Sequence, residues 1–184
     1  MAWSLVLLTA LITITTMDAC IRPDADLLTS RKIGESIVRK AVREAESVLG
    51  STKGLLVKIA WVESRFGKDT LTFRPGYYGG IFQVDLRGFQ ATQDVRSHPG
   101  LSRKFRKIKD AFCIDWRLVR WSDLTKPLYS AIAARLFLSN KPGVIPYSLN
   151  LQARYWKDKY NSRYGKGTVE KFKKRWNEYL SQEK

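Results

Sequence analysis

Glu63 is the side chain of this sequence best placed for acid–base chemistry. On a helical wheel at about 100° per residue, residues 55–66 place Leu56, Ile59 and Ala60 on one face, and Glu63 falls in the middle of that face. The basic residues of the segment fall on the opposite side. A carboxyl group among apolar neighbours loses hydration, which favours its neutral form and raises its pKa. A glutamic acid that keeps its proton near neutral pH is the proton donor that cleavage of a glycosidic bond requires.

The same pattern has two simpler interpretations. Glu63 is then either a partly buried carboxylate paired with one of the many basic residues, or the first residue past a frayed helix end. Buried ion pairs also shift pKa values, so periodicity alone does not choose between a catalytic and a structural glutamate.

Other kinds of catalytic site are hard to assemble from this chain. His98 is the only histidine, and it precedes Pro99 in an expected turn, with no nucleophile signature beside it. Two cysteines without CxxC spacing do not make a zinc site, and no glycine-rich phosphate loop precedes a helix. Elimination leaves carboxylate chemistry without a metal or cofactor, or no chemistry at all.

The amino-terminal segment has the composition of a secretory signal peptide. Residues 3–13 are apolar or small and uncharged, and Asp18-Ala19-Cys20 follows them. Cleavage near Ala19 divides the 184 residues into a signal peptide, 1–19, and one domain, 20–184, of a secreted, extracellular protein. A buried amino-terminal helix and a lipid anchor on Cys20 are the alternatives.

Cys20 and Cys113 are the only cysteines. In a secreted chain an even number of cysteines predicts one disulfide, here between the new amino terminus and the middle of the domain. Two unpaired thiols are the alternative.

The formal net charge is +16. Basic residues gather between positions 103 and 109 and again between 154 and 175. Such a field attracts anionic partners, which for a secreted protein are bacterial envelopes, anionic membranes and free nucleic acid. A charge run can also be only a solvated face.

The chain as a whole predicts a mainly α fold with at most a small β element. Helical spacing occurs in residues 24–49, 55–66, 101–121, 127–138 and 148–160, and from Thr168 onward. Residues 73–80 read as a loop in which Gly79 and Gly80 allow close backbone approach, and residues 81–85 as a candidate extended piece. The loop aromatics Tyr77 and Tyr78 are candidates for stacking on sugar rings.

Three short motifs occur in a characteristic order. They are Glu63-Ser64, then Gly80-Ile81-Phe82-Gln83, whose glutamine lies twenty residues after the glutamate, and Tyr160-Asn161 in a later helix. Together they resemble the pattern of lytic transglycosylases and goose-type lysozymes. Residues 79–85, 155–162 and 165–168 are similar, more closely, to signature segments of phage-encoded members of this superfamily.

The resemblance implies a lysozyme-like fold of two lobes with a central cleft. It implies cleavage of the β-1,4 bond between N-acetylmuramic acid and N-acetylglucosamine in bacterial peptidoglycan, with Glu63 as acid and base. Gln83 and the backbone from Gly80 to Gln83 would contact the glycan, Tyr160 would orient the glutamate, and Asn161 would support the subsite. Ser64 is expected to hold the helix end.

The reaction type stays open at the level of sequence. Most glycosidases need a second carboxylate, whereas in lytic transglycosylases the substrate's own N-acetyl group and 6-hydroxyl take its place. Asp85, Asp69 and Asp94 are candidate second carboxylates, and Asp85 is alternatively the cap of the next helix.

Two functions from different classes therefore compete. The first is an antibacterial or digestive enzyme, expected as a monomer, whose partners are peptidoglycan and the anionic polymers of the bacterial envelope, with nucleic acid not the main partner. The second is a non-enzymatic cationic protein that binds envelopes or nucleic acid and permeabilises bacteria by charge.

Overall fold

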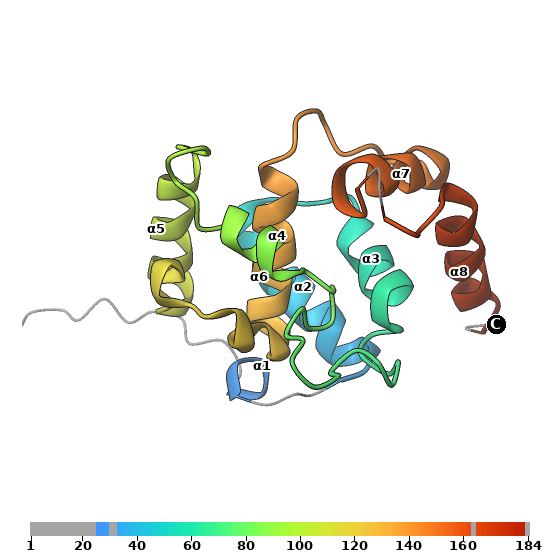
Figure 1. Cartoon of the computed structure of the whole chain (residues 1–184), viewed down its shortest axis with the longest axis horizontal. Coiled ribbons are helices and arrows are strands. Elements are labelled where there is room, and N and C mark those ends of the chain that lie inside the picture. The colour runs from blue at the N-terminus through green and yellow to red at the C-terminus, as the bar shows by residue number, and fades with distance from the viewer. Residues whose placement is uncertain (1–24, 30–32, 163–164, 183–184) are drawn as a thin grey trace, which may run out of the picture.

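Helices make up most of the computed structural model, which describes residues 25–29, 33–162 and 165–182 (Figure 1). The α-helices are α1 (Ala25–Thr29), α2 (Glu35–Leu49), α3 (Leu55–Ser64), α4 (Leu86–Ala91), α5 (Leu101–Phe112), α6 (Pro127–Ser139), α7 (Leu149–Tyr155) and α8 (Val169–Gln182). Shorter helical turns are η1 (Trp116–Leu118), η2 (Trp121–Thr125) and the π turn η3 (Trp156–Tyr160). No strand occurs among the described residues, which confirms the mainly α class.

Helix α6 is the centre of the core. Its sequence is apolar around most of its circumference, as expected for a helix surrounded by other elements, and Leu128, Ile132 and Leu136 are fully buried. Pro127 occupies the first turn, where its missing N–H costs no hydrogen bond. Helix α2 packs along α6 and contributes the largest set of contacts to it.

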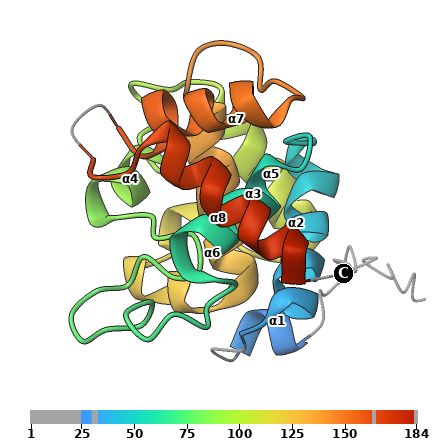
Figure 2. The same cartoon turned by 90° about the vertical axis from the view of Figure 1, so that its right-hand side faces the viewer.

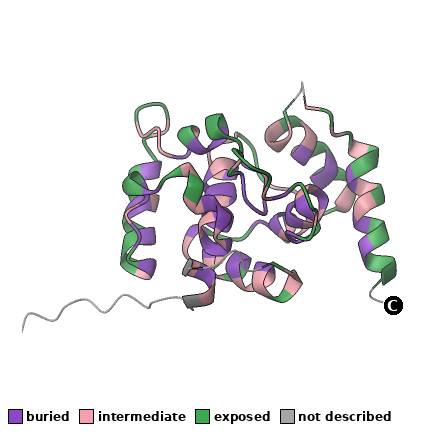
Figure 3. Ribbon diagram, turned by 60° about the horizontal axis from the view of Figure 1, so that its bottom comes forward, coloured by how far each residue is buried: buried purple, intermediate pink, exposed green. Residues whose placement is uncertain are grey.

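The molecule is elongated. Figure 1 places α5 at one end of the long axis and α8 at the other, with α6, α2 and α3 between them. In Figure 2, which looks from the α8 end, α8 crosses in front of α3. Buried residues line the inward sides of these helices, whereas α5 and α8 turn exposed sides to solvent (Figure 3).

The predicted helix over residues 24–49 is interrupted before α2. Gly34 has φ 113°, a conformation that favours glycine, and its N–H donates to the Phe66 carbonyl oxygen at 2.9 Å. This bond ties the start of α2 to the segment that follows α3. The buried stripe of α2 consists of Val38, Ala41, Val42, Ala45 and Leu49.

The candidate extended piece at residues 81–85 forms turns instead. The Gln83 N–H donates to the Gly80 carbonyl oxygen at 3.1 Å, and the Val84 N–H donates to that of Gly79 at 3.0 Å. Gln83 has φ 53°, which reverses the chain direction. Side chains from other elements satisfy further backbone groups of the segment, since Tyr160 donates to the Phe82 carbonyl oxygen and Trp121 to that of Val84. The segment therefore needs no partner strand.

Helix α8 packs on α3 and holds it at two points. The Trp61 indole N–H donates to the Arg175 carbonyl oxygen at 2.7 Å, and the Arg175 guanidinium donates to the Val62 carbonyl oxygen. At the start of α8 the Thr168 hydroxyl accepts from the Lys171 N–H at 3.1 Å and so caps the helix. The end of α3 that carries Glu63 is therefore fixed from the far end of the chain.

Two sequence predictions concern the amino terminus. Residues 1–19, the expected signal peptide, and Cys20 lie outside the described residues. Cys113 ends α5 in a left-handed conformation, φ 56°, and is not a free thiol. Its pairing with Cys20 stays a prediction. Within the described part of the chain, no helix has the length and apolar character needed to cross a membrane.

Candidate active site

Glu63 lies in the last turn of α3, where the helix passes from the core to a groove. Leu56, Ile59 and Ala60, its neighbours on the predicted apolar face, are fully buried. Glu63 itself is half-buried and lines the groove. The orientation predicted from helical periodicity is therefore the one that the structure adopts.

The surroundings of Glu63 favour a carboxyl group that titrates near neutrality. Burial raises the pKa of Glu63 from 4.5 to about 7, because the low-dielectric interior penalises the anion. The Trp156 indole N–H donates to Glu63 Oε1 at 2.9 Å, and this bond and the charges of Arg175 and Lys171 lower the pKa in opposition to burial. Near pH 7 the proton is thus held loosely enough to be transferred.

The chain turns sharply directly after Glu63. The Ser64 hydroxyl donates to the Ala60 carbonyl oxygen at 3.0 Å and accepts from the Gly67 N–H at 2.9 Å. Arg65 and Phe66 have φ of 50° and 57°, and Gly67 follows at 84°. A left-handed conformation costs a non-glycine residue about 1 kcal/mol, so the surrounding contacts must maintain this turn. Ser64 is buried and holds the helix end, which is the role expected for it.

Five of the predicted site residues line one groove with a volume of 590 Å³. They come from three regions of the sequence and are Glu63, Gln83, Asp85, Tyr160 and Asn161. The groove is large enough for a sugar-sized ligand. Folding therefore brings to one groove at least one residue of each of the three motifs that carry the sequence resemblance.

Tyr160 reaches the groove through an irregularity in its helix. Helix α7 continues as the π turn η3, in which the Asn161 N–H donates to the Trp156 carbonyl oxygen at 2.8 Å. Single π turns are rare in proteins, and those that do occur are often found at functional sites. The Tyr160 hydroxyl donates to the Phe82 carbonyl oxygen at 2.7 Å. Burial and the nearby Glu63 carboxylate raise the pKa of Tyr160 well above its usual value, so Tyr160 stays a neutral donor.

The Gln83 side chain holds the loop that forms one wall of the groove. Its amide nitrogen donates to the carbonyl oxygens of Gly80 at 2.7 Å and Thr72 at 3.1 Å, and its amide oxygen accepts from the Arg74 guanidinium at 3.1 Å. The Tyr77 hydroxyl donates to the Gln83 carbonyl oxygen at 3.1 Å. The main role of the Gln83 side chain in this structure is therefore to stabilise the loop that a ligand in the groove would contact.

Gly80 is buried and does not line the groove, but only glycine fits there. Its φ is 63°, and a Cβ atom at this position would lie 1.9 Å from the Leu124 carbonyl oxygen. Tyr78 also lies outside the groove and packs edge-on against Trp121 in an adjoining pocket of 180 Å³. Tyr77 lines both spaces, so it is the better placed of the two tyrosines to meet a ligand beside Glu63.

The candidate second carboxylates are in different places. Asp85 caps α4, where its Oδ1 accepts from the Gly88 N–H at 2.6 Å, and it is exposed at the groove. Asp69 and Asp94 accept hydrogen bonds from nearby backbone N–H groups and do not line the groove. Among the described residues that form the groove, Asp85 is the only carboxylate besides Glu63.

Sequence reasoning missed Trp156 as a member of the site. Its helical spacing with Ala153 and Tyr160 indicates a core position, and it is buried and packs on Phe172 with ring centroids 5.0 Å apart. The same side chain also donates to Glu63. A helical wheel reports which face a tryptophan occupies but not where its N–H points, so the pattern held no signal for this bond.

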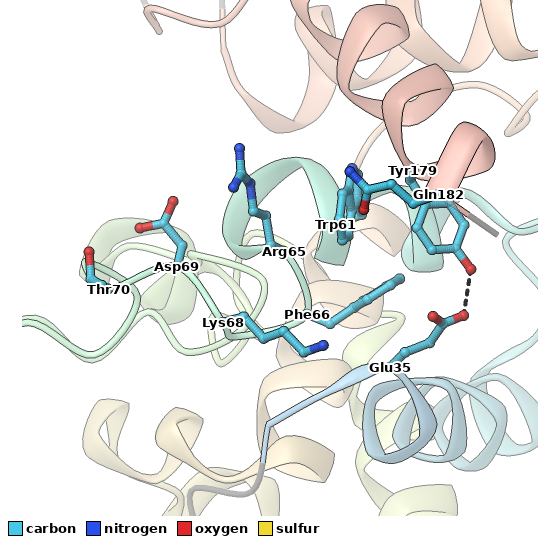
Figure 4. A pocket seen from close by; sticks show the side chains of 9 residues that line it. All are labelled: Glu35, Trp61, Arg65, Phe66, Lys68, Asp69, Thr70, Tyr179 and Gln182. Carbon is cyan, nitrogen blue, oxygen red and sulfur yellow. Dashed lines mark hydrogen bonds between the residues drawn. The ribbon is translucent and has the colours of Figure 1, made fainter.

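A second pocket, of 540 Å³, lies on the other side of α3 (Figure 4). Trp61 and Arg65 line it, and each is two positions, or about 200°, from Glu63 on the helix. In this pocket the Tyr179 hydroxyl donates to Glu35 Oε1 at 2.5 Å, and Arg39 donates to both partners. The polar groups here connect α2 with α8, which makes this pocket a seam between helices.

No cluster of three or more metal-binding side chains occurs in the described part of the chain. The groove contains the Glu63 carboxyl group, which accepts from Trp156, together with the Asp85 carboxylate and the neutral Tyr160 hydroxyl. No family model, no curated protein and no solved structure matches this chain.

Proposed function

We propose that this protein cleaves the glycan strands of bacterial peptidoglycan, with Glu63 as the catalytic acid and base. The observation that carries the proposal is a half-buried carboxyl group that titrates near pH 7 and opens into a groove of 590 Å³. Protonation of a glycosidic oxygen needs a donor with this pKa in a site of this size. The sequence motifs that resemble lytic transglycosylases supply the choice of glycan.

The reaction begins when the Glu63 proton moves to the oxygen that links two sugars. The bond from that oxygen to the anomeric carbon breaks, and a cation develops on the sugar ring. Glu63 is now a carboxylate, and the Trp156 N–H stabilises it at Oε1. The anion forms beside a hydrogen-bond donor that is already in position, so little rearrangement is needed as charge develops.

In the second step Glu63 takes a proton back. If the proton comes from the sugar's own 6-hydroxyl, that oxygen bonds to the anomeric carbon and a 1,6-anhydro ring forms. If it comes from water, the product is a reducing sugar. We favour the anhydro product, because Asp85, the other groove carboxylate, is already engaged as the cap of α4.

The test compares the Glu63→Gln variant with the wild type on purified peptidoglycan. Glutamine keeps the shape and can still accept from Trp156, but it has no proton to give, so the rate should fall by about three orders of magnitude or more. Glu178→Gln is the matched control, since it makes the same side-chain substitution at an exposed position outside the groove. Near-normal cleavage by the Glu63→Gln variant would refute the proposed function.

Mass spectrometry of the released fragments then identifies the reaction. An anhydro product weighs one water less than a hydrolysed product. Fragments that all carry a reducing end would refute the anhydro route and leave glycan cleavage in place.

The non-enzymatic alternative rests on the net charge of +16. It expects bacterial killing that survives Glu63→Gln and declines steeply at high salt, because salt screens exposed charges. Killing that is lost in the Glu63→Gln variant at low ionic strength as well would refute this alternative.

A further inference from the structure

The groove contains two cations that the cleavage step does not use. Arg87 and Lys141 line the same cavity as Glu63. Neither forms an ion pair within the described part of the chain. Arg87 is exposed on α4, whereas Lys141 is half-buried just past the end of α6.

Lys141 is the more informative of the two, because its partial burial is costly. Loss of hydration lowers the pKa of Lys141, and the charge of Lys159 lowers it further, while Asp85 acts in the opposite direction. Its ammonium nitrogen lies 3.9 Å from the centre of the Phe137 ring. A cation held over an aromatic face keeps a defined position but still lacks the anion that usually accompanies a buried charge.

The local packing directs both cations to one wall. The Asn140 side-chain amide donates to the Ala91 carbonyl oxygen at 2.9 Å, which fixes the end of α6 beside the end of α4. Arg87 and Ala91 are four residues apart on one face of α4, and both line the groove. The Phe137 ring also packs edge-on against Tyr160, with centroids 5.5 Å apart. Lys141 and Tyr160 thus contact the same ring.

The charges in the groove leave a positive surplus when Glu63 is protonated. Arg87 and Lys141 contribute two positive charges and Asp85 one negative charge, so the net charge of these lining groups is +1. One Asp85 oxygen is engaged with the Gly88 N–H at 2.6 Å. An uncharged polysaccharide has no anion to pair with Arg87 and Lys141. N-acetylmuramic acid, in contrast, carries a lactyl group that ends in a carboxylate or in a peptide with carboxylates of its own.

We propose that Arg87 and Lys141 form a subsite for a carboxylate borne by the lactyl substituent of the glycan. This inference rests on the proposed function and deepens it, since it makes the enzyme selective for muramic-acid glycans over uncharged β-1,4 glycans. The two side chains act on substrate binding and take no part in proton transfer.

The test is a double cycle of protein and substrate. The substrate is soluble glycan from which phosphate polymers have been removed with hydrofluoric acid, either with free carboxylates or after conversion of the carboxylates to amides. The proteins are the wild type, Arg87→Gln, Lys141→Gln and the double variant. Lys107→Gln is the matched control, because this exposed lysine of α5 does not line the groove.

Amidation should lower the wild-type kcat/KM by about 10- to 100-fold, the range expected for one or two charge-assisted hydrogen bonds. The double variant should show the same loss on the free carboxylates and no further loss on the amides. Lys141→Arg should retain most of the rate. Equal losses by the variants on both substrates, or none on either, would overturn the subsite.

A binding measurement separates this inference from the cleavage proposal. The Glu63→Gln variant, with and without Arg87→Gln and Lys141→Gln, is titrated with the same glycans and with glycan that retains its phosphate polymers. The subsite is supported, even if no cleavage occurs, by two results together. Amidation of the glycan weakens binding, and amidation no longer has this effect in the variant that also carries Arg87→Gln and Lys141→Gln. If removal of phosphate abolishes binding and amidation does not, the anion is a phosphate and the carboxylate subsite is wrong.

Discussion

The Trp156→Phe substitution tests how the protein sets the proton affinity of Glu63. The indole N–H donates to Glu63 Oε1 at 2.9 Å, and this bond favours the anion. Phenylalanine keeps an aromatic ring against Phe172 but has no donor. Loss of the bond should therefore raise the pKa of Glu63 above its value of about 7.

The size of the shift follows from the strength of the bond. A hydrogen bond to a charged group contributes about 1.5–3 kcal/mol, and one pKa unit corresponds to about 1.4 kcal/mol, so complete loss would raise the pKa by about one to two units. Glu63 borders the groove, and water can replace part of the lost interaction. We expect a rise of about one unit.

The assay is the pH dependence of kcat/KM on soluble glycan. A general acid works only while protonated, so activity falls as pH rises through the pKa of Glu63. This alkaline limb should move to higher pH by about one unit in Trp156→Phe. Trp176→Phe is the matched control, because Trp176 is also buried but packs on Tyr179, away from Glu63. An alkaline limb that stays in place, or moves to lower pH, would refute the reasoning.

Two further predictions concern stability. The pKa of Glu63 is about 7 in the folded protein against an ordinary value of 4.5, so ionisation opposes folding. The free energy of unfolding should therefore fall as pH rises from 4.5 to 7, by up to about 3 kcal/mol. Glu63→Gln removes this loss, so it should raise Tm, relative to the wild type, more at pH 8 than at pH 4. A change in Tm that is equal at the two pH values would contradict this prediction. Gly80→Ala should cost about 3 kcal/mol or more in chemical denaturation, because its Cβ would lie 1.9 Å from the Leu124 carbonyl oxygen. Gly76→Ala, at φ 74° with open space around it, should cost only about 1 kcal/mol, and similar costs for both would show that the close contact is unimportant.

The elements that the sequence predicted well are those whose pattern is local. Helix α6 follows from Pro127 and an apolar run, and the orientation of Glu63 follows from its spacing with Ile59 and Ala60. The cap that Asp85 provides to α4 was likewise one of two interpretations at the level of sequence. Each depends on residues within one or two turns of each other, where helical geometry alone decides the contact.

The parts of the site that could not be predicted depend on contacts and backbone geometry that helical periodicity does not encode. Gln83 reads as a ligand contact until its bonds to Thr72 and Arg74 are known. The π turn at Trp156–Tyr160 breaks the helical period on which a wheel depends. Lys141 could not be recognised as a groove residue, because the sequence does not show that Phe137 and α4 lie beside Glu63.

The long sequence separation between Glu63 and its partners also has a consequence for how the protein is made. Trp156 follows Glu63 by 93 residues, and Arg175, which grips the end of α3, follows Val62 by 113. During synthesis on the ribosome, α3 emerges long before either partner exists. A nascent chain therefore holds the Glu63 side chain without the indole or the guanidinium beside it, and the surroundings of Glu63 are complete only when the last helix docks.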